Sequence, residues 1–427
     1  MSQVYHTPEP SHDLEIGIGD RAMPLRKLGP AALLVGLALT VVAIVMMLSP
    51  GTREAMMGSY LLGWYFWMTI VLGMFGLVCL HHTVRGSWAL PWLKLLEAGS
   101  SPLAFGVMFL LFLPVLVSPG TIYEWVNPGN DHLLQKKVFY LNQSAWTIRT
   151  VFYFALWMFM SYVLRKSVLR QEVHNEDGTA EDIAVGRKIE MGRSSWGAVS
   201  IVAYVLSITF ATTDWGMSLQ PHWYSTMYGV QQMIAGVAGA SGLVVAILCI
   251  NARKAPYTEV ITPNLTKDWG NILFMWTMLW AYTSVSQLLI IWNGNLPETA
   301  SFYARRGHMG WNALGMAQIL GVWLIPWMTL LSPRIKRYPH LLRGIAGWIF
   351  FVHVFDVYYN IAPALPHGGF HHGAGRSVIS WTLGTDLIGL AAVGGVWLFV
   401  FAMGIRNQKY LLPNYDRRLQ EALQHAH

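Results

Sequence analysis

Hydrophobic residues along this chain gather into ten long stretches that are separated by shorter polar segments. Each stretch can form a helix that crosses a bilayer, because about 20 apolar residues span a hydrocarbon core of roughly 30 Å. The stretches are too long for transmembrane strands and do not alternate. The pattern therefore predicts an all-α polytopic membrane protein. We expect its spans at residues 29–49, 60–84, 101–122, 145–165, 194–214, 223–250, 270–293, 310–332, 341–362 and 380–404.

Composition and charge placement agree with this class. Hydrophobic residues make up 54% of the 427 residues and charged residues only 12%, too few to coat a soluble protein. Loops and tails on the side of the N-terminus carry 22 Lys and Arg, the opposite loops carry 6, and Arg149 falls inside a span. This bias predicts that the tails at 1–28 and 405–427 are cytoplasmic and flank a membrane domain at 29–404. The net charge of +7 then reflects topology and contact with lipid headgroups, not a nucleic-acid partner.

Two parts of the chain repeat the same features in the same order. A W-Y-x-x-M motif begins at Trp64 near the start of span 2 and at Trp223 near the start of span 6. Near the end of the fourth span of each unit, Asp214 and Asp356 each stand seven residues before a proline. We expect two parallel four-helix bundles, with spans 1 and 10 beside them. The first bundle would cover about 60–214 and the second about 223–362.

Histidine and cysteine positions give no support for a redox cofactor in this chain. A haem b would need two histidines at matching depth, but His81 and His82 lie at the inner end of span 2 and His353 lies in the outer half of span 9. The sequence contains no C-x-x-C-H motif, and two isolated cysteines cannot hold an iron–sulfur cluster. The histidine-rich segment 367–372 is interpreted as a polar outer loop. We therefore expect neither a cofactor nor a metal site.

Polar side chains inside the spans lie mostly towards the outer face. Each needs an explanation, because an ionisable group at the centre of a bilayer costs at least about 2.5 kcal/mol. His353, Asp356 and Asn360 share one face of span 9, and Asp386 would approach them if span 10 packs against span 9. The candidate polar cluster comprises His353, Asp356, Asn360, Asp386, Asp214, Arg149, Gln287, Ser284 and Tyr282.

Two interpretations of this cluster stay open. In the first, Arg149 pairs with an aspartate and the other groups form hydrogen bonds that hold helices together. In the second, the carboxyl groups serve a proton route or line a quinol-facing pocket. A carboxyl group in apolar surroundings is the kind of group that exchanges protons near neutral pH.

Two segments resemble a known family. Residues 214–226 read DWGMSLQPHWYST and resemble the D-W-x-M-S-L-x-P-H-W-Y-S-T signature of the F subunit (ActF) of bacterial alternative complex III. Residues 279–298, which begin LWAY and end GNLPE, resemble a second stretch of the same family, as does Ser332-Pro333-Arg334 after span 8. The family is similar to NrfD/polysulfide-reductase membrane subunits. The chain departs from its pattern at Gln220, where an acid is frequent, and at residues 283–285.

The resemblance implies a function that spacing alone does not give. Alternative complex III oxidises quinol, usually menaquinol, at the outer side of the bacterial plasma membrane in respiratory or photosynthetic electron transport. Iron–sulfur and multihaem cytochrome c subunits receive the electrons, and an ActC-like, NrfD-type membrane subunit is the better candidate for the quinol site. The F subunit carries no redox cofactor and is expected to support assembly and proton translocation.

Two alternatives remain beside that expectation. The chain could be a second quinol-binding subunit, in which case the quinol-facing residues would be Asp214, His222, Trp223 and Tyr224. It could also be a stand-alone secondary transporter, as parallel repeats with buried polar residues would allow. Against a transporter, we expect the inner halves of the spans to lack matching ionisable residues, so that no continuous charged path crosses the membrane.

Overall fold

The computed structural model describes residues 25–176, 180–254, 256–365, 377–378, 382–408 and 410–413. Within these ranges, nine helices are long and apolar enough to cross a membrane, and a bent pair of helices provides a tenth candidate span. The described residues contain no strand. The prediction of an all-α multi-pass membrane protein is thus confirmed. The histidine-rich segment 367–372 and most of both predicted tails lie outside the described residues.

Most predicted spans correspond to one long helix each. These helices are α2 (Leu25–Leu48), α3 (Arg53–Val84), α7 (Gln143–Glu176), α8 (Ala180–Trp215), α9 (Tyr228–Asn251), α11 (Pro263–Gly294), α16 (Pro339–Ile361) and α17 (Leu383–Arg406). The eighth span joins α13 (Trp311–Gln318) to α14 (Ile325–Leu330) through a π-helical segment, Ile319–Leu324. Short helices lie in the connections: α6 (His132–Lys137), α10 (Tyr257–Val260), α12 (Pro297–Arg306) and α15 (Pro333–Arg337).

The third predicted span is wrong in its outline. In place of one helix at 101–122, α4 (Leu90–Gly99) and α5 (Pro102–Val117) form a pair that is bent by 41°. Pro102 cannot continue α4, and the Ser101 side chain accepts a hydrogen bond from the backbone N–H of Ala104, which starts a new helix. Residues 90–99 therefore belong to the packed part of the protein.

The W-Y-x-x-M motif does not mark the start of both spans, so that prediction is also wrong. Trp64 lies three turns inside α3, because this helix already begins at Arg53. Trp223 instead precedes α9, in a connection that follows a single 3₁₀ turn at Met217–Leu219. The two copies of the motif therefore occupy different positions relative to their helices.

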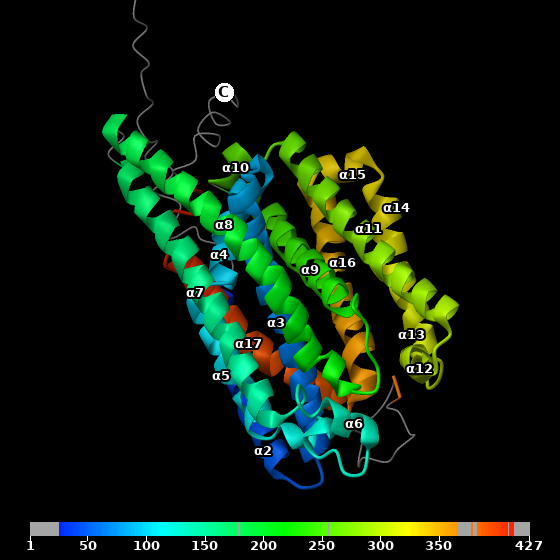
Figure 1. Ribbon diagram of the computed structural model, residues 1–427. Coiled ribbons are helices and arrows are strands. Elements are labelled where there is room, and N and C mark those ends of the chain that lie inside the picture. The colour runs from blue at the N-terminus through cyan, green and yellow to red at the C-terminus, as the bar shows by residue number, and fades with distance from the viewer. Residues whose placement is uncertain are drawn as a thin grey trace, which may run out of the picture.

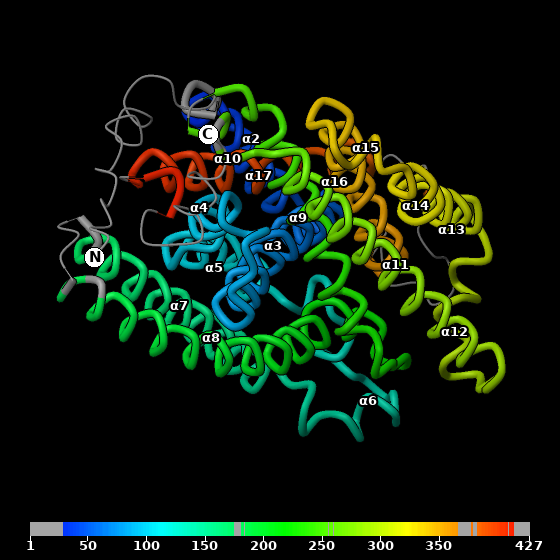
Figure 2. Tube along the Cα trace, turned by 90° about the horizontal axis from the view of Figure 1, so that it is seen from above, coloured from blue at the N-terminus to red at the C-terminus, as the bar shows by residue number. Residues whose placement is uncertain are grey.

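Helix α3 lies at the centre of the molecule (Figure 2), and its residues are buried without a break over 55–79. Glycines allow its neighbours to approach closely. A Cβ atom added to Gly63 would lie 2.4 Å from the carbonyl carbon of Gly389 in α17, and one added to Gly73 would lie 2.3 Å from the carbonyl oxygen of Gly236 in α9. Such small-residue contacts are a main source of helix association in membranes.

The helix contacts form two rings, the first of which includes α3 itself. In the first ring, α3, α5, α7 and α8 each pack against two others of the set. In the second, α9 and the α13–α14 span each pack against α11 and α16, which also contact each other. Helices α2 and α17 pack on each other and against α3. The connecting helices α6 and α12 lie at one end of the molecule, and α10 and α15 lie at the other (Figure 1). The end with α6 and α12 corresponds to the predicted outer face.

Candidate functional site

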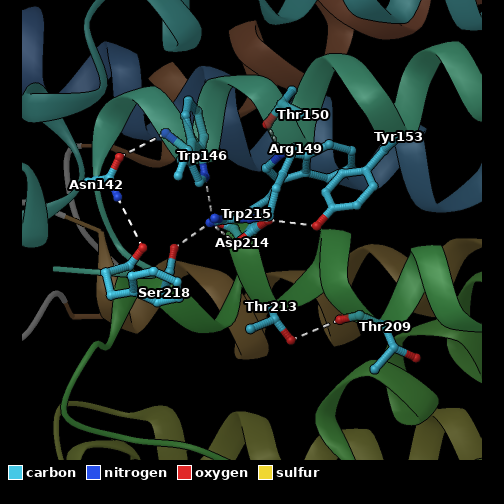
Figure 3. A network of polar contacts seen from close by, with 12 residues as sticks. Asn142, Trp146, Arg149, Thr150, Tyr153, Thr209, Thr213, Asp214, Trp215 and Ser218 are labelled. Carbon is cyan, nitrogen blue, oxygen red and sulfur yellow. Dashed lines mark hydrogen bonds and ion pairs between the residues drawn. The ribbon is translucent and has the colours of Figure 1, made fainter. Parts of the chain in front are cut away.

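Asp214, at the C-terminal end of α8, is fully buried and fully engaged (Figure 3). The Nε and Nη2 atoms of Arg149 donate to its two carboxylate oxygens, both at 2.8 Å, and the Tyr153 hydroxyl donates to Oδ2 at 2.8 Å. Arg149 and Tyr153 stand one turn apart on α7 and so reach the same carboxylate. The prediction that Arg149 pairs with an aspartate is confirmed. A bidentate pair of this kind is among the stronger charge-assisted contacts, and it fixes the orientation of the Asp214 side chain.

Other side chains anchor the backbone around Asp214. The indole of Trp146 donates to the Asp214 carbonyl oxygen at 2.9 Å, and the Ser218 hydroxyl donates to the same oxygen at 2.6 Å. The Tyr140 ring lies under the Arg149 guanidinium, with 3.9 Å between the Cζ atom and the ring centroid. Burial, together with the charge of Asp214, raises the pKa of Tyr140 to about 12. The surroundings of Asp214 therefore form a brace between α7 and α8.

Asp356, on α16, is equally buried but is held differently. Its Oδ1 atom accepts hydrogen bonds from the Trp280 indole at 3.2 Å, the Asn360 amide at 3.4 Å and the Gln318 amide at 3.5 Å. Its Oδ2 atom accepts no hydrogen bond from the described residues. Among the described residues, the one ionisable neighbour of Asp356 within ion-pair distance is His353, whose Nδ1 atom lies 3.9 Å from Asp356 Oδ2. Asp356 thus has no Lys or Arg counter-ion in the described part of the chain.

His353 connects this site to the central helix. Its Nε2 atom lies 2.9 Å from the Thr69 hydroxyl of α3, and Gly239 of α9 makes room for its ring, since a Cβ there would lie 2.8 Å from His353 Cδ2. A cavity of about 10 Å³ adjoins His353 and Asp356 and is lined otherwise by Thr277, Trp280 and small or apolar side chains. That volume is close to the minimum for one water molecule.

Asp386 does not join this pair. Helix α17 makes its main contacts with α2 and α3 and not with α16. Asp386 accepts a hydrogen bond from Ser59 at 2.6 Å, whereas His353 contacts Thr69, ten residues and therefore about 15 Å further along α3. The expected approach of Asp386 to His353 and Asp356 is wrong, because the glycine contacts of α17 place it on another face of α3.

The remaining cluster residues, on α11, differ in their surroundings. Ser284 accepts a hydrogen bond from the Gln231 amide at 3.0 Å, and Gln287 accepts one from Ser225 at 3.4 Å, so both connect α11 to α9 or to the connection before it. Tyr282 is 69% exposed and points away from them. Ser284 and Gln287 therefore bind elements together, and Tyr282 lies outside the polar cluster.

The four candidate quinol-facing residues have separate surroundings. Asp214 is enclosed by its brace, and Trp223 is buried with its ring stacked on Phe302 at 4.3 Å. His222 pairs with Asp131 at 3.0 Å, and the side chain of Tyr224 is more than half exposed. Desolvation acts to raise the pKa of Asp131, but the backbone N–H groups of α6 and then His222 outweigh it and lower that pKa.

Three buried ionisable residues on the predicted inner side, Lys94, Glu97 and Glu172, were not predicted from the sequence. Lys94 of α4 forms a buried ion pair with Glu172 of α7, and Glu97 and His82 each bury a side-chain atom without a hydrogen-bond partner in the described residues. Lys94, Glu97 and Glu172 lie outside the predicted spans at 60–84, 101–122 and 145–165, so the expectation that the inner halves of the spans lack matching ionisable residues stays a prediction. The signal was present, because Lys94 and Glu97 stand three residues apart within an otherwise apolar segment.

Arg306 was also not predicted from the sequence, and it holds α12 against α16. Its guanidinium is fully buried and donates to the carbonyl oxygens of Tyr359, Asn360 and Phe302, each at 2.9 Å. Burial lowers the pKa of Arg306 to about 9, which still leaves it charged at neutral pH. A cation at the C-terminal end of α16 satisfies carbonyl groups that have no partner within the helix.

Among the described residues, no group of three or more His, Cys, Asp or Glu side chains is placed to hold a metal ion. No protein-family model matches the chain, and no curated protein matches it.

Proposed function

We propose that this chain is a cofactor-free membrane subunit of a bacterial quinol-oxidising complex of the alternative complex III type, with both termini in the cytoplasm. In this proposal, Asp214 supports assembly and Asp356 carries protons that move when partner subunits oxidise quinol, such as menaquinol. The resemblance of residues 214–226 and 279–298 supports membership of the complex. Both segments contribute to the aspartate sites, since the first contains Asp214 and the second contains Trp280, which donates to Asp356.

The two aspartates are proposed to be equivalent positions in two parallel four-helix bundles. The two rings of helix contacts support this arrangement. Helix α7 presents W-x-x-R-x-x-x-Y from Trp146 to Tyr153, and α13 presents W-x-x-L-x-x-x-Q from Trp311 to Gln318. In each case the last residue donates a hydrogen bond to the buried aspartate of its own bundle. Leu314 then occupies in the second bundle the position that Arg149 occupies in the first.

The proposed proton role of Asp356 rests on this difference, because Leu314 stands where Arg149 supplies a counter-ion to Asp214. A charged carboxylate in apolar surroundings is costly without a counter-ion, so a buried carboxyl group that lacks one binds a proton readily. Asp214 has its counter-ion and stays fixed, because releasing it from Arg149 would leave two uncompensated charges. Asp356 has no such partner among the described residues, and it is therefore the one of the two that can gain and lose a proton.

Giving the second bundle the missing cation tests this role. Leu314 lies one turn before Gln318 on the same helix face, so an arginine in its place would reach Asp356 as Arg149 reaches Asp214. We expect Leu314→Arg to assemble and to oxidise quinol, but to release fewer protons per electron. Leu314→Gln is the matched control, because it adds a polar side chain without charge and should leave the proton count unchanged. Equal proton counts in the two assembled variants would contradict the proposal.

Purification tests membership of the complex. A native gel stained for haem, followed by mass spectrometry of the stained band, should find this chain together with an ActC-like membrane subunit, an iron–sulfur subunit and a multihaem cytochrome c. Recovery of the chain alone in a colourless, monodisperse and transport-competent form would favour a secondary transporter instead.

A further inference from the structure

The hydrogen-bond pattern at His353 assigns the proton positions on its ring. The Thr69 hydroxyl has a single hydrogen, and it donates this hydrogen to the carbonyl oxygen of Phe66 at 2.7 Å. Thr69 can therefore only accept from His353 Nε2, which lies 2.9 Å away. In this arrangement Nε2 carries the hydrogen of a neutral imidazole, and Nδ1 is then a bare acceptor.

The bare Nδ1 atom of His353 faces a second hydrogen-bond acceptor, the Oδ2 atom of Asp356. The Nδ1 atom lies 3.9 Å from Asp356 Oδ2, and no described group donates a hydrogen bond to Oδ2. The other carboxylate oxygen already accepts from Trp280, Gln318 and Asn360. Two buried lone pairs that face each other without a proton leave both groups unsatisfied, which is costly in an apolar interior. One proton shared between them satisfies both.

We propose that His353 and Asp356 form a site that holds one proton, located on Asp356 Oδ2 at rest, and that one water molecule in the adjoining cavity links this proton to His353 Nδ1. The separation of 3.9 Å is too long for a direct hydrogen bond but suits a bridging water. The cavity volume of about 10 Å³ is close to what one water needs. Thr277, which also lines the cavity, donates to the Phe274 carbonyl oxygen and can accept from that water.

The apolar lining of the cavity favours the proton on Asp356 at rest. Apolar side chains of α9, the π-helical segment and α16 make up most of it, so the neutral pair is favoured over a carboxylate beside an imidazolium. Transfer breaks the O–H bond of Asp356 and forms an N–H bond at His353 Nδ1, with the water passing one proton on as it receives one. The net charge of the pair does not change, and no electron moves.

Among the described residues, no other group beside the pair would supply the proton at neutral pH. The titratable side chains that face the pair from its neighbours are tyrosines, Tyr65 of α3 and Tyr228 of α9, with Tyr359 following on α16. No Lys or Arg of the described residues forms an ion pair with Asp356. The pair is thus an isolated one-proton site.

Infrared spectroscopy of the resting complex tests the location of the proton. A protonated carboxyl group has a carbonyl stretch apart from the carboxylate bands, and this stretch shifts in D₂O. We expect such a band that is lost in Asp356→Asn and kept in Asp386→Asn, the matched control of another buried aspartate. If Asp356→Asn fails to assemble, Asp356→Glu keeps the acid and should shift the band. An acid band that neither Asp356 variant alters would overturn the proposal.

Nitrogen-15 spectra of labelled histidine test the other half of the pair. We expect a neutral Nε2–H resonance that disappears in His353→Gln, changes in Thr69→Val and persists in Thr69→Ser, which keeps the hydroxyl. An imidazolium or an Nδ1–H tautomer at His353 would contradict the assignment. The inference deepens the proposed proton role, but both measurements use resting protein. A protonated Asp356 in a complex that moves no protons would therefore refute the proposed function alone.

Discussion

Replacing Arg149 with leucine should strongly lower the free energy of unfolding, because it removes the counter-ion of the buried Asp214. Arg149→Leu takes away both guanidinium donors and leaves a carboxylate that has no exposed surface. Breaking a buried ion pair by removing one partner costs about 3–5 kcal/mol. The Arg149 side chain is 21% exposed, so water reaches part of the pair, and we expect a loss near the lower end, about 3 kcal/mol. Tyr153→Phe removes one hydrogen bond to the same carboxylate and should cost about 2 kcal/mol.

Unfolding of the purified protein in detergent, followed by tryptophan fluorescence, measures these losses. Arg305→Leu is the matched control, because Arg305 is exposed and its loss should change stability by less than about 0.5 kcal/mol. Adding Asp214→Asn to Arg149→Leu removes the uncompensated charge and should recover part of the loss. A cost below about 1 kcal/mol for Arg149→Leu, or no recovery in the double variant, would show that the pair is not a buried brace.

Three further predictions concern packing, topology and cofactors. Gly389→Ala should lower the unfolding temperature, because its Cβ would lie 2.4 Å from the Ser59 carbonyl oxygen. Gly384→Ala on the same helix is the control, because its Cβ meets nothing within 4 Å and the unfolding temperature should stay unchanged. Equal unfolding temperatures for the two variants would contradict the close contact at Gly389. An impermeant thiol reagent applied to intact cells should label Ala300→Cys and not Ser2→Cys, and the reverse result would invert the topology. The isolated chain should show no reduced-minus-oxidised haem band, and such a band would refute its cofactor-free assignment.

Hydropathy predicted the spans well because a membrane leaves helices few alternatives. An arginine inside a span needs a nearby acid, so the Arg149 pairing was part of one of the two interpretations left open, and the structure shows that pair. Hydropathy failed where local chemistry interrupts a helix. Pro102 ends α4 before α5, so residues 90–99 were predicted as a connection and the buried Lys94 was not expected. Hydropathy failed again for Asp386, because sequence order does not tell which helices become neighbours; the glycine contacts between α3 and α17 decide that.

Asp356 is proposed to carry protons, whereas Asp214 is proposed only to brace α7 against α8. The most direct measurement is the number of protons released per electron by the assembled complex with Asp356→Asn, in sealed vesicles supplied with quinol. The asparagine keeps the shape and the Oδ1 hydrogen bonds but cannot release a proton. We predict continued quinol oxidation with fewer protons released per electron and a smaller membrane potential. An unchanged ratio of protons to electrons in this variant would contradict the proton role of Asp356.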